Sequence, residues 1–334
     1  MHHGNVSSEI AKGLLALKER IKQAAIPPSK LDESINVAIW NVREFGKTKR
    51  LEASLHYIAE IIGQFDLVAL VELRDKLEDL ACVMDYLGEY WDVIYSDWVD
   101  DPGGNNERIA YLFDRRAVTF NGLAAEVDAP RKKKATEYLA DQSFWRAPYM
   151  ASFRAGNFDF VTIATHTRWG DSDKGRQAEL AMLAAWIDAR FQPKKQAKQS
   201  EAFEDSDLIV MGDFNIPQID DAFFKALTGT GLLVPDKLKQ LTIGDKKVGG
   251  SNLLKNKRFD QILHLPTIPA NFCNAGGTLD FYIDDDHIKE LFPKDKLTRE
   301  KFTFQLSDHF PVWIQIKTDI DGFRLNQLIQ DNRK

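Results

Sequence analysis

Leu208-Ile-Val-Met-Gly-Asp-Phe-Asn215 is the most informative run in this chain of 334 residues. Its four leading apolar residues, two of them β-branched, predict a fully buried strand. Gly212 at the end of the run lets another backbone or a ligand approach closely. Asp213 and Asn215 are two positions apart, so on an extended backbone they face the same way. Such a pair suits a cation, a phosphate oxygen or an attacking water, although Asp and Asn also favour plain turns.

Similar apolar runs surround this stretch and are interleaved with amphipathic helices. Strands are predicted at 35–40, 65–73, 91–95, 108–113, 149–153, 158–165, 258–263 and 310–316. Apolar residues at helical spacing predict helices at 5–26, 51–62, 77–87, 175–190 and 220–227, with a weaker helical pattern at 319–334. The segments 128–142 and 266–305 are expected to be loops. Strands outnumber helices, and many strands are adjacent in sequence, which predicts two packed sheets flanked by helices, an α/β sandwich.

Composition and charge narrow the class of protein. The hydrophobic content is 44% and the net charge is −6, which argues against a protein that grips nucleic acid with its whole surface. No apolar run approaches the length of a membrane span, so no membrane partner is expected. Cys82 and Cys273 are the only cysteines, so no disulfide framework is expected. These features, with no visible signal peptide, favour a cytoplasmic protein, although a removed leader would leave no trace.

Three segments are expected along the chain. Residues 1–34 form an amphipathic helix and a linker that ends after Pro27-Pro28, residues 35–318 form one catalytic domain, and residues 319–334 form a tail. The N-terminal helix is expected to pack on the domain, with a partner-binding arm as the alternative. Nothing in the chain specifies an oligomer, and a monomer is favoured.

Polar side chains gather where the predicted strands end or begin. They are Asn41, Glu72, Glu107, Arg146, His166, Asp213, Asn215, Asp260, Asp308 and His309. Carboxylate and amide oxygens are hard ligands that suit Mg²⁺, Mn²⁺ or Ca²⁺. A histidine beside a carboxylate can serve as an acid or a base, and an arginine can bind a phosphate with two hydrogen bonds. Each residue alone also has an ordinary structural explanation, but together they suit metal-assisted displacement at phosphorus.

This set of motifs resembles the endonuclease/exonuclease/phosphatase superfamily and, within it, the deoxyribonuclease I family. The stretch from Trp40 to Lys49, its following helix and Leu70–Asp75 run nearly collinear with that family. Further matches in family order are Glu107–Phe113, Phe144–Pro148, Thr165-His166, Gly212–Asn215, Phe259–Ile262 and Ser307–Pro311. The resemblance spans residues 35–317 and implies a four-layer α/β sandwich with two mostly antiparallel sheets.

The resemblance also implies roles for individual residues. Glu72 is expected to be the principal Mg²⁺ ligand, helped by Asn41 and Asp308. Asp213 and Asn215 are expected to hold the phosphate, the attacking water or a second metal. His309 would be the base, oriented by Asp260, and His166 the acid, oriented by Glu107. The phosphate-binding and DNA-contacting residues would be Arg146, Arg43 and Arg74.

The implied activity is Mg²⁺-dependent, largely sequence-nonspecific hydrolysis of DNA to 5′-phosphate and 3′-hydroxyl ends. Double-stranded DNA is the expected partner, Mn²⁺ is expected to substitute for Mg²⁺, and Ca²⁺ could have a structural role. One alternative keeps the chemistry but acts on a lipid or inositol-phosphate substrate. Another is a catalytically inactive binding module on the same fold. An abasic-site repair nuclease is disfavoured, since those enzymes generally lack a histidine at the position of His166.

The sequence departs from the family pattern in several places. Asn105 stands where the family has a tyrosine that stacks in the DNA minor groove, so groove contacts are expected to be weaker or supplied elsewhere. The family's disulfides have no counterpart, and only the acidic stretches Asp284–Asp286 and Asp97–Asp101 are candidates for its structural calcium sites. The segments 131–141 and 192–206 and the N-terminal helix are interpreted as additions.

Overall fold

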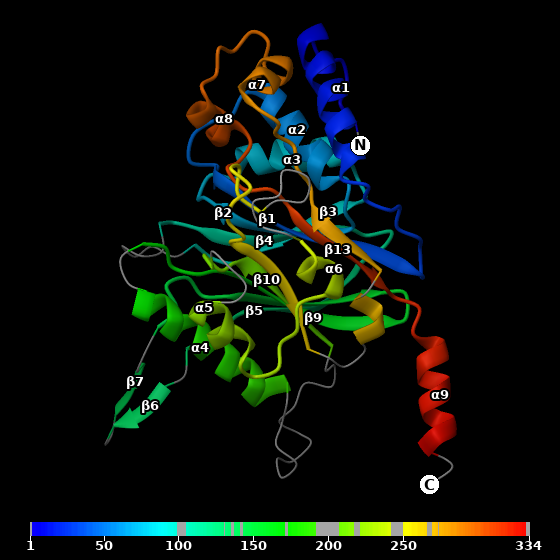
Figure 1. Cartoon of the computed structure of the whole chain (residues 1–334), viewed down its shortest axis with the longest axis vertical. Helices are drawn as coiled ribbons and strands as arrows, with labels where there is room; N and C mark the ends of the chain where they lie inside the picture. The colour runs from blue at the N-terminus through cyan, green and yellow to red at the C-terminus, as the bar shows by residue number, and fades with distance from the viewer. Residues whose placement is uncertain are drawn as a thin grey trace.

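The computed structural model describes residues 2–98, 105–129, 131–134, 137–140, 143–170, 173–191, 207–216, 221–241, 250–265, 269–272 and 274–331. Two β-sheets pack face to face at its centre (Figure 1). The first sheet has the order β12 (Ala275–Thr278), β13 (Val312–Lys317), β1 (Ser34–Phe45), β2 (Leu67–Leu73), β4 (Arg108–Asp114) and β3 (Trp91–Tyr95). The second has the order β11 (Asp260–His264), β10 (Leu208–Asp213), β9 (Phe158–His166), β8 (Tyr149–Ala155) and β5 (Thr119–Glu126).

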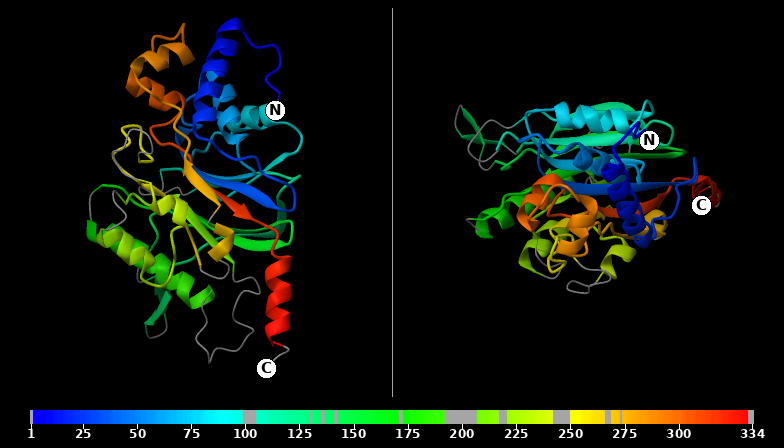
Figure 2. Two further views of the ribbon diagram at one scale, coloured as in Figure 1. Left: turned by 45° about the vertical axis from the view of Figure 1, so that its right-hand side comes forward. Right: turned by 90° about the horizontal axis from the view of Figure 1, so that it is seen from above.

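Helices cover the outer face of each sheet, so the fold has the four layers that the resemblance implied. Figures 1 and 2 show one group of helices over the first sheet and another beneath the second. The first group comprises α1 (Ser8–Gln23), α2 (Glu52–Ile62), α3 (Glu78–Leu87), α7 (Asp285–Leu291) and α8 (Arg299–Gln305). The second comprises α4 (Asp173–Phe191) and α5 (Ala222–Thr228), while α6 (Asp236–Lys239) packs beside β12. Within the described sheets, β1–β2 and β9–β10 are the parallel pairs, and the other pairings are antiparallel.

Strand β1 shows why the apolar runs are continuous rather than alternating. Val37 and Ile39 pack into the core between the two sheets. Ala38 and Trp40 pack into a second core, between the first sheet and the helices that cover it. Both faces of the strand are therefore buried, and both need apolar side chains. On α1, Leu17 is fully buried in this second core, and the helix packs on α2 and α7. The N-terminal helix is thus packed on the sandwich, as expected.

Several elements differ from the sequence-based expectation. Strand β1 continues past Trp40 to Phe45, and β5 falls where no strand was predicted. The segment 266–305 was expected to be loop-rich, but it contains η2 (Pro269–Phe272), β12, α7 and α8. The basic run 131–134 was expected in a loop and instead forms β6 (Arg131–Lys134), paired with β7 (Glu137–Ala140). The predicted connection at 192–206 lies outside the described residues.

The C-terminal segment forms α9 (Asp321–Asp331). This helix stands away from the sandwich in Figure 1 and in the left panel of Figure 2. Its side chains Phe323, Leu325 and Leu328 are exposed. Among the described residues, no helix has the combined length and apolarity that crossing a bilayer would require.

Candidate active site

The sheet topology explains why the polar strand ends meet. The parallel pairs β1–β2 and β9–β10 end at the same edge of the sandwich, and their last residues include Glu72, His166 and Asp213. The antiparallel neighbours β4 and β11 begin at that edge, because their first residues pair with the last residues of β2 and β10, and β13 begins opposite Ile39 of β1. Asp260 is the first residue of β11, Glu107 directly precedes β4, and His309 lies three residues before β13. Residues far apart in sequence converge because the ends of the parallel pairs and the starts of their antiparallel neighbours lie along one edge.

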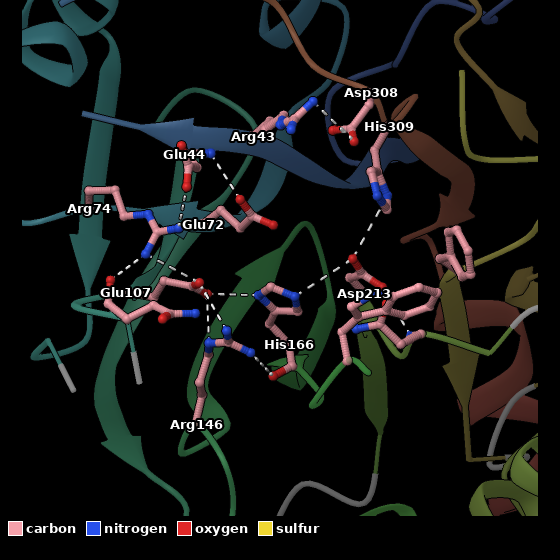
Figure 3. Close-up of a pocket in the computed structure, with 14 residues that line it drawn as sticks. Arg43, Glu44, Glu72, Arg74, Glu107, Arg146, His166, Asp213, Asp308 and His309 are labelled. Atoms are coloured by element: carbon pink, nitrogen blue, oxygen red, sulfur yellow. Dashed lines mark hydrogen bonds and ion pairs between the residues drawn. The ribbon is translucent and has the colours of Figure 1, made fainter. Parts of the chain in front are cut away.

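These side chains line a cleft of about 450 Å³. Its lining residues are Arg43, Glu44, Glu72, Arg74, Asn105, Glu107, Arg146, His166, Trp169, Asp213, Asn215, Phe259, Asp308 and His309. Figure 3 shows that the labelled side chains reach the cleft from both sheets. Asn41 and Asp260 do not line the cleft but lie directly behind it, each hydrogen-bonded to a residue that does. The structure thus brings together all twelve residues that the sequence singled out.

His309 and Asp260 form a buried pair. His309 Nδ1 lies 2.7 Å from Asp260 Oδ2, which fixes the orientation of the ring and leaves Nε2 as the nitrogen that can exchange a proton with water. Burial, together with repulsion from Asp213, raises the pKa of Asp260 to about 6. Burial lowers the pKa of His309, but the carboxylates of Asp260 and Asp213 outweigh burial and hold it well above its usual value. This is the arrangement of a histidine oriented by an acid.

His166 has a similar arrangement on the other side of the cleft. Its Nδ1 lies 2.8 Å from Glu107 Oε2, and its Nε2 lies 3.8 Å from Asp213 Oδ2. Burial and the nearby Arg146 guanidinium lower the pKa of His166, but Glu107 and Asp213 outweigh them and the net shift is upward. A ring with a raised pKa is more often protonated, which suits a hydrogen-bond donor or an acid.

Asp213 lies between the two imidazoles. Its Oδ2 is 3.8 Å from a nitrogen of each ring and accepts a 3.0 Å hydrogen bond from Asn41 Nδ2. Its Oδ1 accepts a hydrogen bond from the Asn215 backbone N–H at 3.0 Å. The Asn215 side chain donates to the Thr167 carbonyl at 2.8 Å. This carboxylate is thus fixed by hydrogen bonds at the centre of the site.

Glu72 is a partly buried carboxylate held in its ionised form. Its Oε1 accepts from Asn41 Nδ2 at 2.9 Å and its Oε2 from the Glu44 backbone N–H at 2.9 Å. Burial raises the pKa of Glu72, but His166, these two hydrogen bonds and His309 together lower it to about 2. No lysine or arginine salt bridge to Glu72 is present in the described part of the chain, so the carboxylate is free to bind a cation.

The oxygens around Glu72 fit a hard divalent ion. Asn41 Oδ1 is buried and has no hydrogen-bond partner among the described residues, so it is an acceptor without a donor. Asp308 is more open, with 41% of its side chain exposed, and its carboxylate lies 3.7 Å from the Arg43 guanidinium. A second group, Asp213, Asp260 and His309, has one ligand atom from each residue within 4.8 Å of the others. The first group has the hard oxygens that suit a metal, and the second also has its ligand atoms close together, although hydrogen bonding between His309 and Asp260 already occupies part of it.

The three arginines differ in what they contact. Arg146 donates to Glu107 Oε1 at 3.0 Å, and Arg74 lies 3.5 Å from the same oxygen. Arg74 is buried and also contacts Glu44 and the Asn105 carbonyl, so it holds the cleft wall together. Arg43 is 30% exposed at the rim and lies over the Phe304 ring. Of the three, Arg43 is the guanidinium most open to a substrate phosphate.

The backbone of the cleft is strained. Glu44, Glu72, Asn105 and Asn215 all have left-handed φ angles, of 47°, 63°, 56° and 53°. Asparagine tolerates this conformation, but it is uncommon for glutamate. The strand pairing is irregular at both glutamates, between Asn41 and Phe45 and between Leu70 and Leu73. Such irregularities redirect side chains and gather at functional sites.

Some lining residues were not predicted from the sequence. Trp169 and Phe259 form an aromatic part of the wall, and Glu44 supplies the backbone N–H that binds Glu72. Phe259 directly precedes Asp260, and Trp169 follows His166 by three residues. Their proximity to predicted residues was a usable signal, but nothing in the pattern distinguished a cleft aromatic from a core aromatic.

The candidate calcium stretches have other partners. Asp284 caps α7 by accepting from the Asp286 and His287 backbone N–H groups, Asp285 pairs with Arg299, and Asp286 pairs with Lys289. Asp97 lies 3.5 Å from Arg108, and the rest of the stretch to Asp101 lies outside the described residues apart from Trp98.

Comparisons with known proteins agree with this geometry. Deoxyribonuclease-1 of Bos taurus is 27% identical over 191 residues, which cover 54% of this chain and 61% of that protein. The chain thus spans less than two thirds of the length of that curated relative. Among solved structures, a Bacteroides thetaiotaomicron protein of the endonuclease/exonuclease/phosphatase family has a TM-score of 0.55 at 16% identity, covering 86% of this chain and 99% of that one. Truncated TDP2 of Caenorhabditis elegans has a TM-score of 0.52 at 14% identity, covering 85% and 97%.

The two structural neighbours show only that the fold is shared, because their sequence identity to this chain is too low to transfer a function. The profile of the Endonuclease/Exonuclease/phosphatase family matches residues 38–309, a range that contains Asn41, Glu72, Asp213 and His309. The chain therefore belongs to the endonuclease/exonuclease/phosphatase family, whose members are metal-dependent hydrolases of phosphate esters.

Proposed function

We propose that this protein is a Mg²⁺-dependent, largely sequence-nonspecific DNA endonuclease that leaves 5′-phosphate and 3′-hydroxyl ends. The observation that carries the proposal is the pair of carboxylate-bound imidazoles on either side of Asp213, beside an ionised Glu72. The similarity to deoxyribonuclease-1 supports DNA as the substrate class. The residues are expected to perform an in-line displacement by water at phosphorus.

Each residue has a role that follows from its contacts. His309, oriented by Asp260, is assigned to take a proton from the attacking water through Nε2, a role that requires the neutral ring and therefore favours a pH above its raised pKa. His166, oriented by Glu107, donates a hydrogen bond or a proton to the oxygen that leaves or carries the developing charge. Asp213 and Asn215 position the water and the phosphate between the two rings. Arg146 and Arg43 add positive charge beside the phosphate.

Glu72, Asn41 and Asp308 would hold the divalent ion. Bound there, a Mg²⁺ ion would polarise a phosphoryl oxygen and neutralise charge. The hard oxygens and the unpartnered Asn41 Oδ1 support this assignment. Mn²⁺, which accepts the same ligands, is expected to substitute.

The cleft lining favours a charged substrate over a lipid. Among the lining residues only Trp169 and Phe259 are apolar, and the others are charged or amide side chains. A lipid phosphodiesterase needs an apolar wall for acyl chains. Within the described part of the chain no aliphatic residue lines the 450 Å³ cleft itself, and the cavity beside it adds only Leu253 and Leu254. An inositol-phosphate substrate shares the phosphate chemistry and belongs in the same activity panel.

Nicking of a supercoiled plasmid tests the proposal. We expect nicked and then linear DNA with Mg²⁺ and none with a chelator. DNA ligase is expected to reseal the nicks directly, because the ends carry a 5′-phosphate and a 3′-hydroxyl. His309→Ala should remove nicking, while Asp85→Ala, which changes an exposed carboxylate on α3, should retain it. If the plasmid stays intact at every Mg²⁺ concentration while a sphingomyelin or inositol-phosphate substrate is hydrolysed, the protein is a lipid or inositol-phosphate hydrolase and the nuclease proposal is wrong.

A further inference from the structure

Trp169 is an exposed aromatic side chain inside a concave and otherwise polar cleft. It is 63% exposed, whereas Trp40 and Trp313 are buried. Its ring packs nearly at a right angle on Phe259, with 5.4 Å between centroids. The Phe259 ring in turn lies 5.8 Å from the His309 ring. An aromatic wall, Trp169 and Phe259, therefore starts beside His309 and extends outward to solvent.

The position of this aromatic wall is supported from behind. The guanidinium of Arg176, which is buried on α4, lies 5.7 Å from the Trp169 centroid and 4.3 Å from the Phe223 centroid. Trp169 is held in place but leaves most of its surface in water, so it adds little to the stability of the fold. Exposed aromatic surface in a cleft of this kind marks a binding surface.

The cleft continues past the reacting groups on the same side. A second cavity of about 460 Å³ shares Arg43, Phe259, Asp308 and His309 with the first. It extends to Leu254, which is 64% exposed, and to Arg299 on α8. Phe259 borders both cavities. A nucleic acid chain that threads the cleft would therefore pass the aromatic wall close to His309, whose ring lies beside that of Phe259.

We propose that Trp169 and Phe259 form a stacking subsite for one unpaired nucleobase next to the scissile phosphate. The inference rests on the proposed nuclease function and refines its substrate to single-stranded or locally unpaired DNA. In a duplex both faces of a base are covered by its neighbours, so a base must leave the stack before it can contact an aromatic side chain. Every base has a flat π face, so stacking of this kind is tolerant of sequence. The net charge of −6 gives the chain no overall attraction to phosphates, so contacts to bases would add affinity that charge does not supply.

A double-mutant cycle tests the subsite. One arm removes the Trp169 ring from the protein, and the other removes the base from the substrate. The protein forms are wild type, Trp169→Ala, which removes the ring, and Trp169→Phe, which keeps one. The substrates are a single-stranded oligonucleotide, the same backbone with abasic residues, and the same sequence as a duplex. Stacking on one side chain is worth roughly a 5- to 150-fold change in affinity, so Trp169→Ala should raise KM on the single strand by a factor in that range. Its kcat should change little, and Trp169→Phe should recover part of the loss.

If the base stacks on Trp169, the effect of removing the ring on KM should depend on whether the substrate has a base. Trp169→Ala should leave KM on the abasic strand near the wild-type value, and wild type should have a lower KM on the single strand than on the duplex. Tyr90→Ala, which removes a 49% exposed aromatic ring from the surface outside the cleft, is the matched control and should match wild type on all three substrates. Anisotropy of a labelled oligonucleotide with a chelator present gives the same comparison without turnover.

Two failures are distinguishable. If wild type hydrolyses the oligonucleotides but Trp169→Ala changes KM equally with and without bases, or not at all, the subsite is wrong and the nuclease assignment stands. If wild type neither binds nor hydrolyses any of the three substrates, the proposed function itself is wrong, and the subsite falls with it.

Discussion

Asp213 shows at the scale of single residues how the site depends on fixed distances. Its Oδ2 is 3.8 Å from both His166 and His309, and each ring is held by a further carboxylate behind it. The two histidines are thus kept in defined orientations on either side of one anionic centre. The contributions of the outer carboxylates, Asp260 and Glu107, can be measured separately.

Replacing Asp260 by asparagine tests whether the carboxylate orients His309. Asp260 is fully buried and makes the 2.7 Å contact with His309 Nδ1, so Asp260→Asn keeps the shape but removes the charge and the fixed tautomer. We expect kcat to fall roughly 10²- to 10⁴-fold, the range found for losing an oriented general base. Thermal unfolding monitored by circular dichroism should show a folded protein. Asp85→Asn on α3 is the control, and a kcat equal to that of the control would contradict the role.

Replacing Glu107 by glutamine should shift a pH profile. Burial and Arg146 lower the pKa of His166, but Glu107 and Asp213 raise it, so removing the Glu107 charge is expected to lower that pKa. An acid must be protonated to act, and its activity is lost as the pH rises through its pKa. The alkaline limb of the kcat profile of Glu107→Gln should therefore move to lower pH.

The direction of this shift separates charge from structure. A variant that merely loosens the cleft would lower kcat at every pH without moving the limb. His166→Ala should have no limb of this kind to move. An alkaline limb at unchanged or higher pH in Glu107→Gln would exclude His166 as the acid.

At this scale the sequence predicted which residues meet but not how they are held. Asn41, Glu72 and His309 could be chosen because they stand where apolar runs end or begin and because the family resemblance implies roles for them. The left-handed backbone of Glu72 and the burial of Arg74 against Glu107 depend on contacts between distant segments. No local pattern encodes those contacts, and Trp169 was missed for the same reason.

At the scale of elements, burial decided which predictions were right. Strands β1, β2, β9 and β10 are buried on both faces, so their continuous apolar runs were recognisable. Strand β5 is an edge strand with many exposed positions and contains Gly122 at a left-handed φ of 92°. Its composition resembles a loop. Helices α7 and α8 are seven residues each, too short for a helical period to stand out.

Helix α1 should contribute to stability through its buried face. Leu17 is fully buried, so Leu17→Ala is expected to lower the free energy of unfolding by about 2–5 kcal/mol. Leu15, two residues earlier on the same helix, is 65% exposed, and Leu15→Ala should change it by less than about 0.5 kcal/mol. Urea unfolding gives both values. Equal effects of the two variants would mean that α1 does not pack on the sandwich as described.

At the scale of the whole molecule, the site joins the two sheets. Glu72 and Asp308 come from the sheet built around β1, whereas Asp213 and His166 come from the sheet built around β9 and β10. The resemblance could predict this architecture because the ordered motifs fall at the ends of matching strands. The position of α9 away from the sandwich and the pairing of β6 with β7 lie outside those motifs, and the sequence did not predict them.

Mg²⁺ should stabilise the whole chain if the oxygens of Glu72, Asn41 and Asp308 hold it. Binding to the folded state alone, at 100 times Kd, adds about 2.7 kcal/mol to the free energy of unfolding. We therefore expect Mg²⁺ to raise Tm by a few degrees in a scanning calorimeter and Glu72→Gln to remove most of that rise. Glu19→Gln, on the exposed face of α1, is the control and should retain it. A rise in Tm of equal size in Glu72→Gln would place the ion elsewhere.

The left-handed glutamates have a consequence for laboratory evolution. Glycine adopts a φ near +60° without the steric penalty that Glu44 and Glu72 incur, so a screen that rewards only heat resistance should enrich glycine at both positions. The Glu72→Gly survivors would be sturdier proteins that had lost the carboxylate on which hydrolysis is proposed to depend. A selection for durable variants of this fold therefore has to score turnover in every round.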